Sequence, residues 1–207
     1  LHVGIEGVAM CEGAYQHALN YAKDRVQGAP LGQVEAKTII HHGDVRRMLM
    51  HMKAMTEATR AVNYNAASSL DRGEKGDEAA FKRLEFLTPI AKAWATEVAQ
   101  EVTGLGVQIH GGMGFVEETG AAQFVRDARI ITIYEGTTGI QGLDLIGRKI
   151  LRDGGAQLMS VMAEVEATVK QLQKEPNSLP QLTAELTTAL DQWQKASLDI
   201  TGRVMDD

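Results

Sequence analysis

Apolar residues recur at intervals of three, four and seven along nearly the whole of this 207-residue chain. That spacing places them on one side of an α-helix, whereas a half-buried strand needs strict alternation of apolar and polar residues. No alternating segment is long enough to build a sheet. The pattern therefore predicts an all-α fold, in which helices bury their apolar sides against one another.

The first three quarters of the chain contain the segments expected to form a helical bundle. Helices are predicted over residues 5–26, 42–70, 78–109, 117–130 and 138–151. Asp77 is placed to cap the third helix, and Pro89 should kink or divide it. Within "GLGVQIHGGMGF", residues 104–115, five of twelve residues are glycine, which is too many for a stable helix interior. We expect a flexible loop there that lets the backbone approach a ligand or partner closely.

A separate pattern follows "RDGG", residues 152–155. Apolar residues step by four, three, four and three from Leu158 to Leu172, and a matching stripe runs from Leu182 to Ile200. The segment "QKEPNSLP", residues 173–180, breaks the pattern between them. We expect a helical hairpin over residues 155–207, appended to a bundle over residues 1–151 and packed against it or against a neighbouring subunit.

Charge and composition exclude several classes of function. Lysine and arginine number 21 against 27 acidic residues, a net charge of −6, so there is no electrostatic case for nucleic-acid or anionic-membrane binding. No run approaches the ~20 apolar residues needed to span a bilayer, and no signal peptide is visible, so we expect a soluble cytoplasmic protein. The single cysteine, Cys11, is expected to serve packing. Because the first residues already carry helical periodicity without a cap, we expect the chain to continue upstream.

The motifs that carry metal or phosphate chemistry are missing. No glutamate has a histidine three residues later, and neither His-Glu-x-x-His, paired Cys-x-x-Cys nor Gly-x-x-x-x-Gly-Lys occurs, so no metal site is predicted. His110 lies in "QIHGGMG", where a glycine loop would expose its donors to a polar ligand, although a structural role is equally open. Glu135 follows the apolar run "IITIY". On spacing alone such a residue is more often a turn residue or a helix-start charge than a catalyst.

Four stretches taken together resemble one family. "YAKDRVQG", "QIHGGMGF", "RDARI" and "IYEGTTGIQ" occur in the order and at the separations seen in the C-terminal domain of acyl-CoA dehydrogenases, over residues 1–151. The resemblance extends to the larger subgroup that includes 3-methylmercaptopropionyl-CoA dehydrogenases. It implies an up-and-down four-helix bundle with the hairpin appended.

The resemblance also implies an activity, the FAD-dependent oxidation of an acyl-CoA thioester to the trans-2-enoyl-CoA. Glu135 would remove the α proton while hydride leaves the β carbon for the flavin N5, and Gly136 would lie against the substrate. A base flanked by apolar residues is suited to this role, because its affinity for a proton rises when substrate excludes water. The backbone N–H of Glu135 would help to hold the thioester oxygen as enolate charge develops.

Further residues carry over from the family by position. Arg25 would meet the flavin pyrophosphate, a task suited to a fixed cation, and Thr137 and Thr138 would lie at the cofactor of their own active site. A segment that would meet the partner subunit's FAD comprises Gln108, Ile109, His110, Gly111 and Gly112. A homodimer or dimer of dimers, with an electron-transfer flavoprotein as electron acceptor, is implied.

Three departures separate the chain from the family pattern. The family commonly has a phenylalanine and a glycine soon after the arginine, whereas this chain reads "RVQGAPL", so the aromatic contact is absent or comes from elsewhere. Gly139 stands where a glutamine is often found. Arg148 is displaced by one position from a CoA-contacting arginine of some members, a rotation of about 100° on an α-helix, and is kept as a candidate for substrate binding. The family's N-terminal helical and middle β domains are absent, so this chain alone is expected to be inactive. Two alternatives stay open: an acyl-CoA oxidase, or a non-enzymatic relative that serves assembly or nucleic-acid binding, which the acidic charge and the intact Glu135 disfavour.

Overall fold

The computed structural model describes residues 1–175 and 179–206, and the described part is helical. Its sole β pairing is an isolated antiparallel bridge between Val26 and Thr38. The all-α prediction is therefore confirmed. Packing divides the chain into two units, Leu1–Gly142 and Leu143–Asp207. The boundary predicted between residues 151 and 155 stays a prediction. Among the described helices, none combines the length and apolar character that crossing a bilayer requires.

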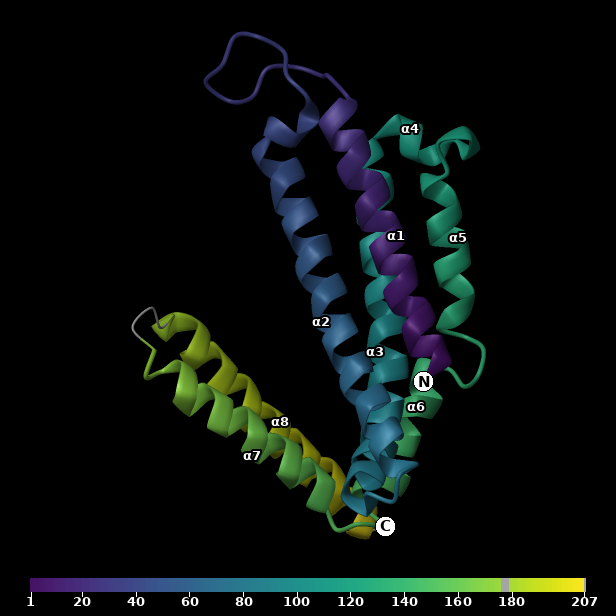
Figure 1. The fold of residues 1–207 in the computed structure, drawn as a ribbon, viewed down its shortest axis with the longest axis vertical. Coiled ribbons are helices and arrows are strands. Elements are labelled where there is room, and N and C mark those ends of the chain that lie inside the picture. Colours follow the sequence, from purple (N-terminus) through teal and green to yellow (C-terminus); the bar gives the residue numbers. More distant parts are fainter. Residues whose placement is uncertain (176–178, 207) are drawn as a thin grey trace. The chain divides into compact units, whose positions relative to one another are not determined.

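Four helices form the first unit in up-and-down order. They are α1 (His2–Asp24), α2 (Gly43–Gly73), α3 (Glu78–His110) and α5 (Ala121–Ile131). As Figure 1 shows, they lie side by side, with α3 in contact with each of the other three and α1 in contact with α2 and α5. Short elements connect them: η1 (Ile39–His41) before α2, and α4 (Gly112–Phe115) with η2 (Glu117–Thr119) before α5. The four-helix bundle is confirmed.

The start of α3 follows the prediction, and its middle departs from it in part. The Asp77 carboxylate accepts a hydrogen bond from the Ala80 N–H at 3.0 Å and pairs with Arg72 at 2.6 Å, which satisfies one of the free N–H groups of the first turn. The helix is not divided at Pro89, since α3 continues as one element through it. The residue before the proline, Thr88, donates its hydroxyl to the Leu84 carbonyl, one turn earlier, at 2.7 Å.

The glycine-rich segment, residues 104–115, is helical on both sides of Gly111, contrary to the expectation of a loop. Residues 104–110 belong to α3, and the helix ends at Gly111, whose φ of 61° and ψ of −139° suit glycine. Gly106 packs between helices: a Cβ there would lie 3.7 Å from Ala14 and 3.8 Å from Met52. Packing of α3 against α1 and α2 therefore outweighs the poor helix propensity of glycine.

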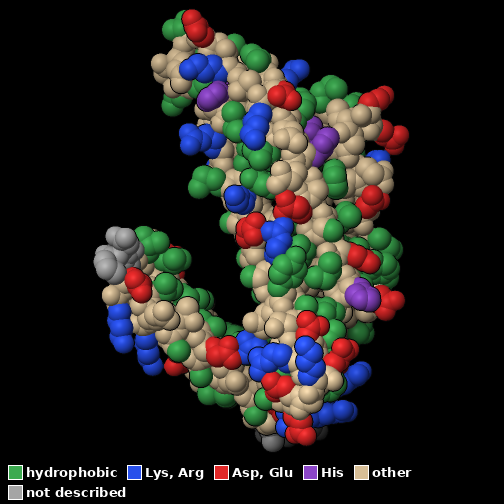
Figure 2. Space-filling model, viewed as in Figure 1, with side chains coloured by type: hydrophobic (Ala, Val, Ile, Leu, Met, Phe, Trp, Pro, Cys, Tyr) green, Lys and Arg blue, Asp and Glu red, His purple; other side chains and the backbone are tan. Residues whose placement is uncertain are grey.

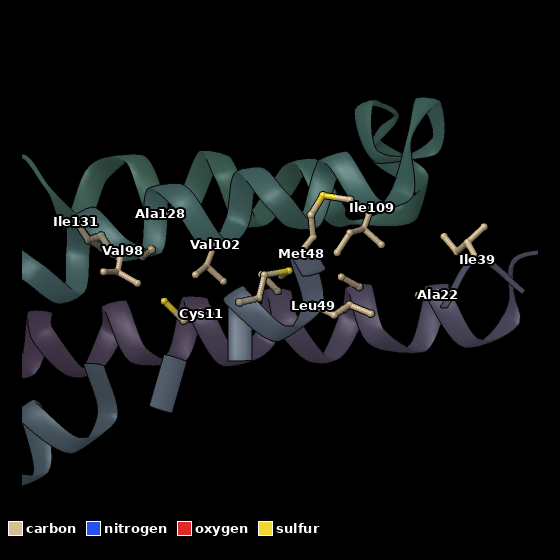
Figure 3. Close-up of a cluster of buried hydrophobic side chains, with 14 of the residues drawn as sticks. Cys11, Ala22, Ile39, Met48, Leu49, Val98, Val102, Ile109, Ala128 and Ile131 are labelled. Atoms are coloured by element: carbon tan, nitrogen blue, oxygen red, sulfur yellow. The ribbon is translucent and has the colours of Figure 1, made fainter. Parts of the chain in front are cut away.

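The core of this unit is built from small and apolar side chains. Figure 3 shows Cys11 of α1 together with Met48 of α2 and Val102 of α3 in one buried cluster. Cys11 is fully buried, which confirms its packing role, and burial raises the pKa of its thiol to about 12. Met48 and Met52 are also buried. Gly7 lets α1 approach α3, because a Cβ there would lie 2.7 Å from the Ala95 carbonyl oxygen.

The second unit contains the predicted hairpin. Helices α7 (Ala156–Leu172) and α8 (Pro180–Asp206) pack on each other, and their buried residues include Leu158, Met162, Val169 and Leu190. Part of the predicted break, residues 176–178, lies outside the described residues. Helix α6 (Thr138–Asp144) leads into a π-helix, η3 (Leu145–Ile150), in which the Leu151 N–H donates to the Ile146 carbonyl five residues earlier at 3.0 Å. The predicted helix over residues 138–151 is therefore α-helical at first and π-helical at its end.

Candidate active site

The turn between α5 and α6 holds Glu135 in an uncommon backbone conformation. Its φ is 52°, and among the described residues it alone, apart from glycines, has a positive φ. The left-handed region costs an L-residue roughly 1–2 kcal/mol, because Cβ approaches a carbonyl oxygen. Such strain persists where the surroundings enforce it, and it clusters at functional positions. Gly136 follows with a φ of 90°, so two consecutive residues turn the chain sharply.

Hydrogen bonds fix the two peptide groups that follow Glu135. The Lys92 ammonium, from α3, donates to the Gly136 carbonyl at 2.6 Å. The Gln141 side-chain amide, from α6, donates to the Glu135 carbonyl at 3.2 Å and to the Gly136 carbonyl at 3.3 Å. The carbonyls of Glu135 and Gly136 are therefore both held by side chains from flanking helices.

Two residues that flank Glu135 and Gly136, Tyr134 and Thr138, form hydrogen bonds with side chains of α1 and α3. The Tyr134 hydroxyl donates to the Glu6 carboxylate of α1, and this contact is the main reason that the pKa of Tyr134 is raised to about 12. The Thr138 hydroxyl donates to Glu97 of α3 at 2.5 Å. The turn is thus fastened on both sides, which explains how it retains the conformation at Glu135.

A surface hollow of about 640 Å³ opens beside this turn. The residues around it come from the start of α1, from α3 and from the turn: Leu1, His2, Val3, Glu6, Thr88, Lys92, Tyr134, Glu135 and Gln141. Glu135 is exposed at its wall, whereas Lys92 is 4% exposed. A carboxylate at the wall of a hollow can take a proton from a bound molecule once that molecule displaces water.

A second group of predicted site residues lies at the other end of the bundle (Figure 1). The Tyr21 ring, one turn before Arg25, stacks on His110 with ring centroids 4.3 Å apart, which brings the end of α1 to the glycine segment. Lys92 and His110 are eighteen residues apart on α3, which corresponds to about 27 Å along the helix. Within the bundle, the structure therefore places Glu135 at one end and Arg25 with the glycine segment at the other.

His110 is buried rather than presented by a loop. Its Nδ1–H donates to the Gly106 carbonyl at 2.7 Å, its ring lies against His17 and Tyr21, and its Nε2 has no partner among the described residues. Burial is the main reason that its pKa is lowered. The expectation that glycine would expose this side chain is wrong, because the helix continues through residue 110.

The remaining residues of the segment differ in exposure. Ile109 is also buried, whereas Gln108, Gly111 and Gly112 are exposed. A Cβ added at Gly111 or Gly112 would meet no atom within 4 Å. The backbone at these two glycines is therefore open to an approaching molecule, while Ile109 and His110 could contribute through their backbone.

Among the residues that the structure describes, no group of three or more histidine, cysteine, aspartate or glutamate side chains could hold a metal ion. Figure 2 shows basic and acidic side chains interspersed over the visible face. No basic stripe of the kind that follows a nucleic-acid backbone appears on that face.

Comparison with known proteins places the chain in a family. The family model for the acyl-CoA dehydrogenase C-terminal domain matches residues 1–151. The chain belongs to the acyl-CoA dehydrogenase family. It is 53% identical over 178 residues to the 3-methylmercaptopropionyl-CoA dehydrogenase of Ruegeria pomeroyi, a match that covers 83% of this chain and 30% of that protein. The chain therefore spans about a third of the length of such relatives.

Solved structures show the same likeness. Butyryl-CoA dehydrogenase from Megasphaera elsdenii is 33% identical with a TM-score of 0.59, over 70% of this chain and 34% of that one. ACDH-11 from Caenorhabditis elegans, solved in complex with C11-CoA, has a TM-score of 0.80 over 99% of this chain and 33% of that one. At 22% identity, this second likeness concerns the fold.

The family resemblance had located Glu135 and Gly136, but it had not located the side chains that hold them. Lys92, Glu6, Glu97 and Gln141 were missed. Lys92 did leave a signal: it falls at helical spacing with the buried residues Thr96, Ala99 and Thr103. A lysine on a buried helix face needs a partner, and that requirement could have drawn attention to it.

Two further candidates occupy the start of α6 and the π-helix. The Thr137 hydroxyl accepts a long hydrogen bond from the Ile140 N–H at 3.4 Å, near the start of α6. Arg148 lies in η3, in the second unit, and pairs with Asp144 at 3.3 Å. Because each turn of a π-helix holds more residues than a turn of an α-helix, the rotation of about 100° expected for Arg148 does not apply. Arg148 stays a prediction as a substrate-binding residue.

Proposed function

We propose that the protein containing this chain is an FAD-dependent acyl-CoA dehydrogenase and that Glu135 is its catalytic base. The observation that carries the proposal is the strained conformation of Glu135, held by hydrogen bonds from two helices at the wall of a hollow. Membership of the family and the position of Glu135 in "IYEGTTGIQ" support it. The strain has a use here, because it presents a carboxylate at a fixed place.

The proposed reaction moves one proton and one hydride. The α C–H bond of the acyl-CoA breaks and its proton passes to the Glu135 carboxylate. Bound FAD supplies the two-electron acceptor for the hydride that leaves the β carbon. A double bond forms between the two carbons, which gives the trans-2-enoyl-CoA. The N–H of Glu135 is proposed to donate to the thioester oxygen, where charge develops as the proton leaves.

The chain's residues fit an FAD cofactor shared between subunits. At the end of the bundle remote from Glu135, the open backbone of Gly111 and Gly112 allows a planar or anionic group to approach closely. Arg25 is exposed there and has no ion-pair partner among the described residues, so its guanidinium is available to a pyrophosphate. About 27 Å of α3 between the two places supports a role for this end at the FAD of a partner subunit. We therefore propose a homodimer or a dimer of dimers.

The same reasoning leads to proposals for the other parts. Thr137 and Thr138 would lie at the cofactor of their own subunit, and an electron-transfer flavoprotein would accept the electrons. Residues 155–207 are proposed to form an extension that packs on a bundle or a neighbouring subunit. The isolated 207-residue chain is expected to retain no stoichiometric FAD through gel filtration, and a full complement of bound FAD would contradict this.

The test of the activity is an anaerobic acyl-CoA panel with the full-length protein. Butyryl-CoA, 3-methylmercaptopropionyl-CoA and a long-chain acyl-CoA are added separately, and the flavin absorbance is followed. At least one should bleach the flavin and yield the matching trans-2-enoyl-CoA by mass spectrometry. Absence of bleaching with every thioester would contradict the proposal and favour a non-enzymatic role. Hydrogen peroxide formed in air, one per enoyl product, would instead indicate an acyl-CoA oxidase.

A further inference from the structure

Lys92 is a buried cation next to the proposed base. Its side chain is 4% exposed, and its ammonium donates to the Gly136 carbonyl at 2.6 Å. Burial lowers its pKa, and the Glu97 and Glu135 carboxylates act in the opposite direction. Taking a charge out of water is costly, so a buried ammonium is expected where its interactions serve a purpose.

The hydrogen bond from Lys92 acts on the peptide group between Gly136 and Thr137. Gln141 holds the Glu135 carbonyl, and Lys92 holds the Gly136 carbonyl from the opposite helix. If the second contact were lost, the chain could relax toward ordinary backbone angles, because the strain at Glu135 favours that change. The carboxylate would then move, since its place depends on the backbone angles of its own residue.

The charge of Lys92 matters as well as its hydrogen bond. The ammonium and the Glu135 carboxylate attract each other. A neutral donor in place of Lys92 could hold the carbonyl, but it would not supply this attraction.

We propose that Lys92 is the positioning residue for proton abstraction: it holds the Gly136 carbonyl and keeps Glu135 in its left-handed conformation. This inference rests on the proposed function of Glu135. Lys92 acts through Glu135 and need not touch the substrate. Its removal should therefore slow the step that breaks the α C–H bond more than it weakens thioester binding.

The test compares variants of the full-length holoenzyme. Lys92→Met removes the charge and the hydrogen-bond donor while keeping most of the side-chain volume. Lys92→Arg keeps the charge but changes the length of the side chain and the shape of the donor group. Lys82→Met, which removes an exposed ammonium from the same helix, is the matched control. FAD content and the thermal midpoint are recorded for each variant to verify that it folds.

Two readouts separate proton abstraction from the complete reaction. The first is the incorporation of solvent deuterium at the α carbon of 3,3-dimethylbutyryl-CoA, which has no β hydrogen and so cannot be oxidised. The second is the rate of flavin reduction by butyryl-CoA, measured over a range of butyryl-CoA concentrations so that the limiting rate and the half-saturating concentration are obtained separately. Lys92→Met should slow the exchange and the limiting rate of flavin reduction by about 10- to 100-fold, the effect of a misplaced catalytic group. The half-saturating concentration should change less than the limiting rate, and Lys82→Met should leave all three unchanged.

The outcomes distinguish this inference from the proposed function. If the wild type shows neither exchange nor bleaching, the proposed function fails and the inference fails with it. If the wild type is active and folded Lys92→Met matches it in exchange rate and in the limiting rate of flavin reduction, the inference alone is overturned. Should Lys92→Met not fold, Lys92→Arg decides: slowed exchange is expected, and exchange at the wild-type rate contradicts the inference.

Discussion

The backbone strain at Glu135 can be measured by comparing two substitutions. Glu135→Ala removes the carboxylate but keeps Cβ, whereas Glu135→Gly removes both. At a φ of 52°, Cβ costs roughly 1–2 kcal/mol, and glycine has no such cost. Glycine also lowers the unfolding free energy by about 0.4–1 kcal/mol relative to alanine, because it gives the unfolded chain more conformational freedom. The difference leaves Glu135→Gly more stable than Glu135→Ala by about 1 kcal/mol.

The assay is thermal unfolding of the two full-length variants under identical conditions, with a control pair in a helix. At Lys82, an exposed position in α3, alanine should exceed glycine in stability by about 1 kcal/mol, which is the usual helical order. The order at residue 135 should be the reverse. If alanine were the more stable residue at both positions, the left-handed conformation of Glu135 would be refuted, and with it the strain argument.

Three other features give further predictions. Gly7→Ala would place Cβ against the Ala95 carbonyl and should lower the unfolding free energy by about 1–3 kcal/mol. Gly104→Ala, with open space around its Cβ, should raise the unfolding free energy by about 0.5–1 kcal/mol. Urea denaturation measures both changes, and the opposite signs would contradict the packing of α1 on α3. Burial lowers the pKa of His110, so as the pH falls the unfolded chain binds a proton at this histidine before the folded chain does. The contribution of the neutral His110 to the unfolding free energy is therefore fully present above about pH 6.5 and declines as the pH falls below that value. His110→Phe should flatten the loss of stability between about pH 7.5 and pH 5.5, and a loss as steep as in the wild type would count against the buried neutral imidazole. Because burial raises the pKa of Cys11 to about 12, peptide mass spectrometry should find it unmodified after iodoacetamide treatment of the folded protein and alkylated in urea; equal labelling in both would show that the thiol is accessible.

The helices could be predicted from the sequence because their apolar spacing is long and regular. Burial of one face decides such segments, and α2 and α7 follow the predicted stripes. The segment around Gly104 and Gly106 shows where this reasoning fails. Propensity is a local preference, and the contacts of α3 with α1 and α2 outweighed it.

The candidate site was predictable in a different way. Spacing alone left Glu135 as a probable charge near a helix start, and the family resemblance supplied the hypothesis of a base. Neither source could give its positive φ, because Lys92 and Gln141, whose side chains hold the carbonyls of this turn, are distant or unremarkable in the sequence. Long-range contacts of this kind become visible only when the helices are placed side by side.

The most direct test of the central claim replaces the base and changes little else. Glu135→Gln keeps the shape of the side chain but removes its ability to accept a proton, and Glu117→Gln, at an exposed position before α5, is the control. Rapid mixing with butyryl-CoA under anaerobic conditions should show flavin reduction slowed by about 100-fold or more in Glu135→Gln, the usual loss on removing a general base. Glu117→Gln should behave as the wild type. Flavin reduction at the wild-type rate in folded, FAD-loaded Glu135→Gln would contradict the account.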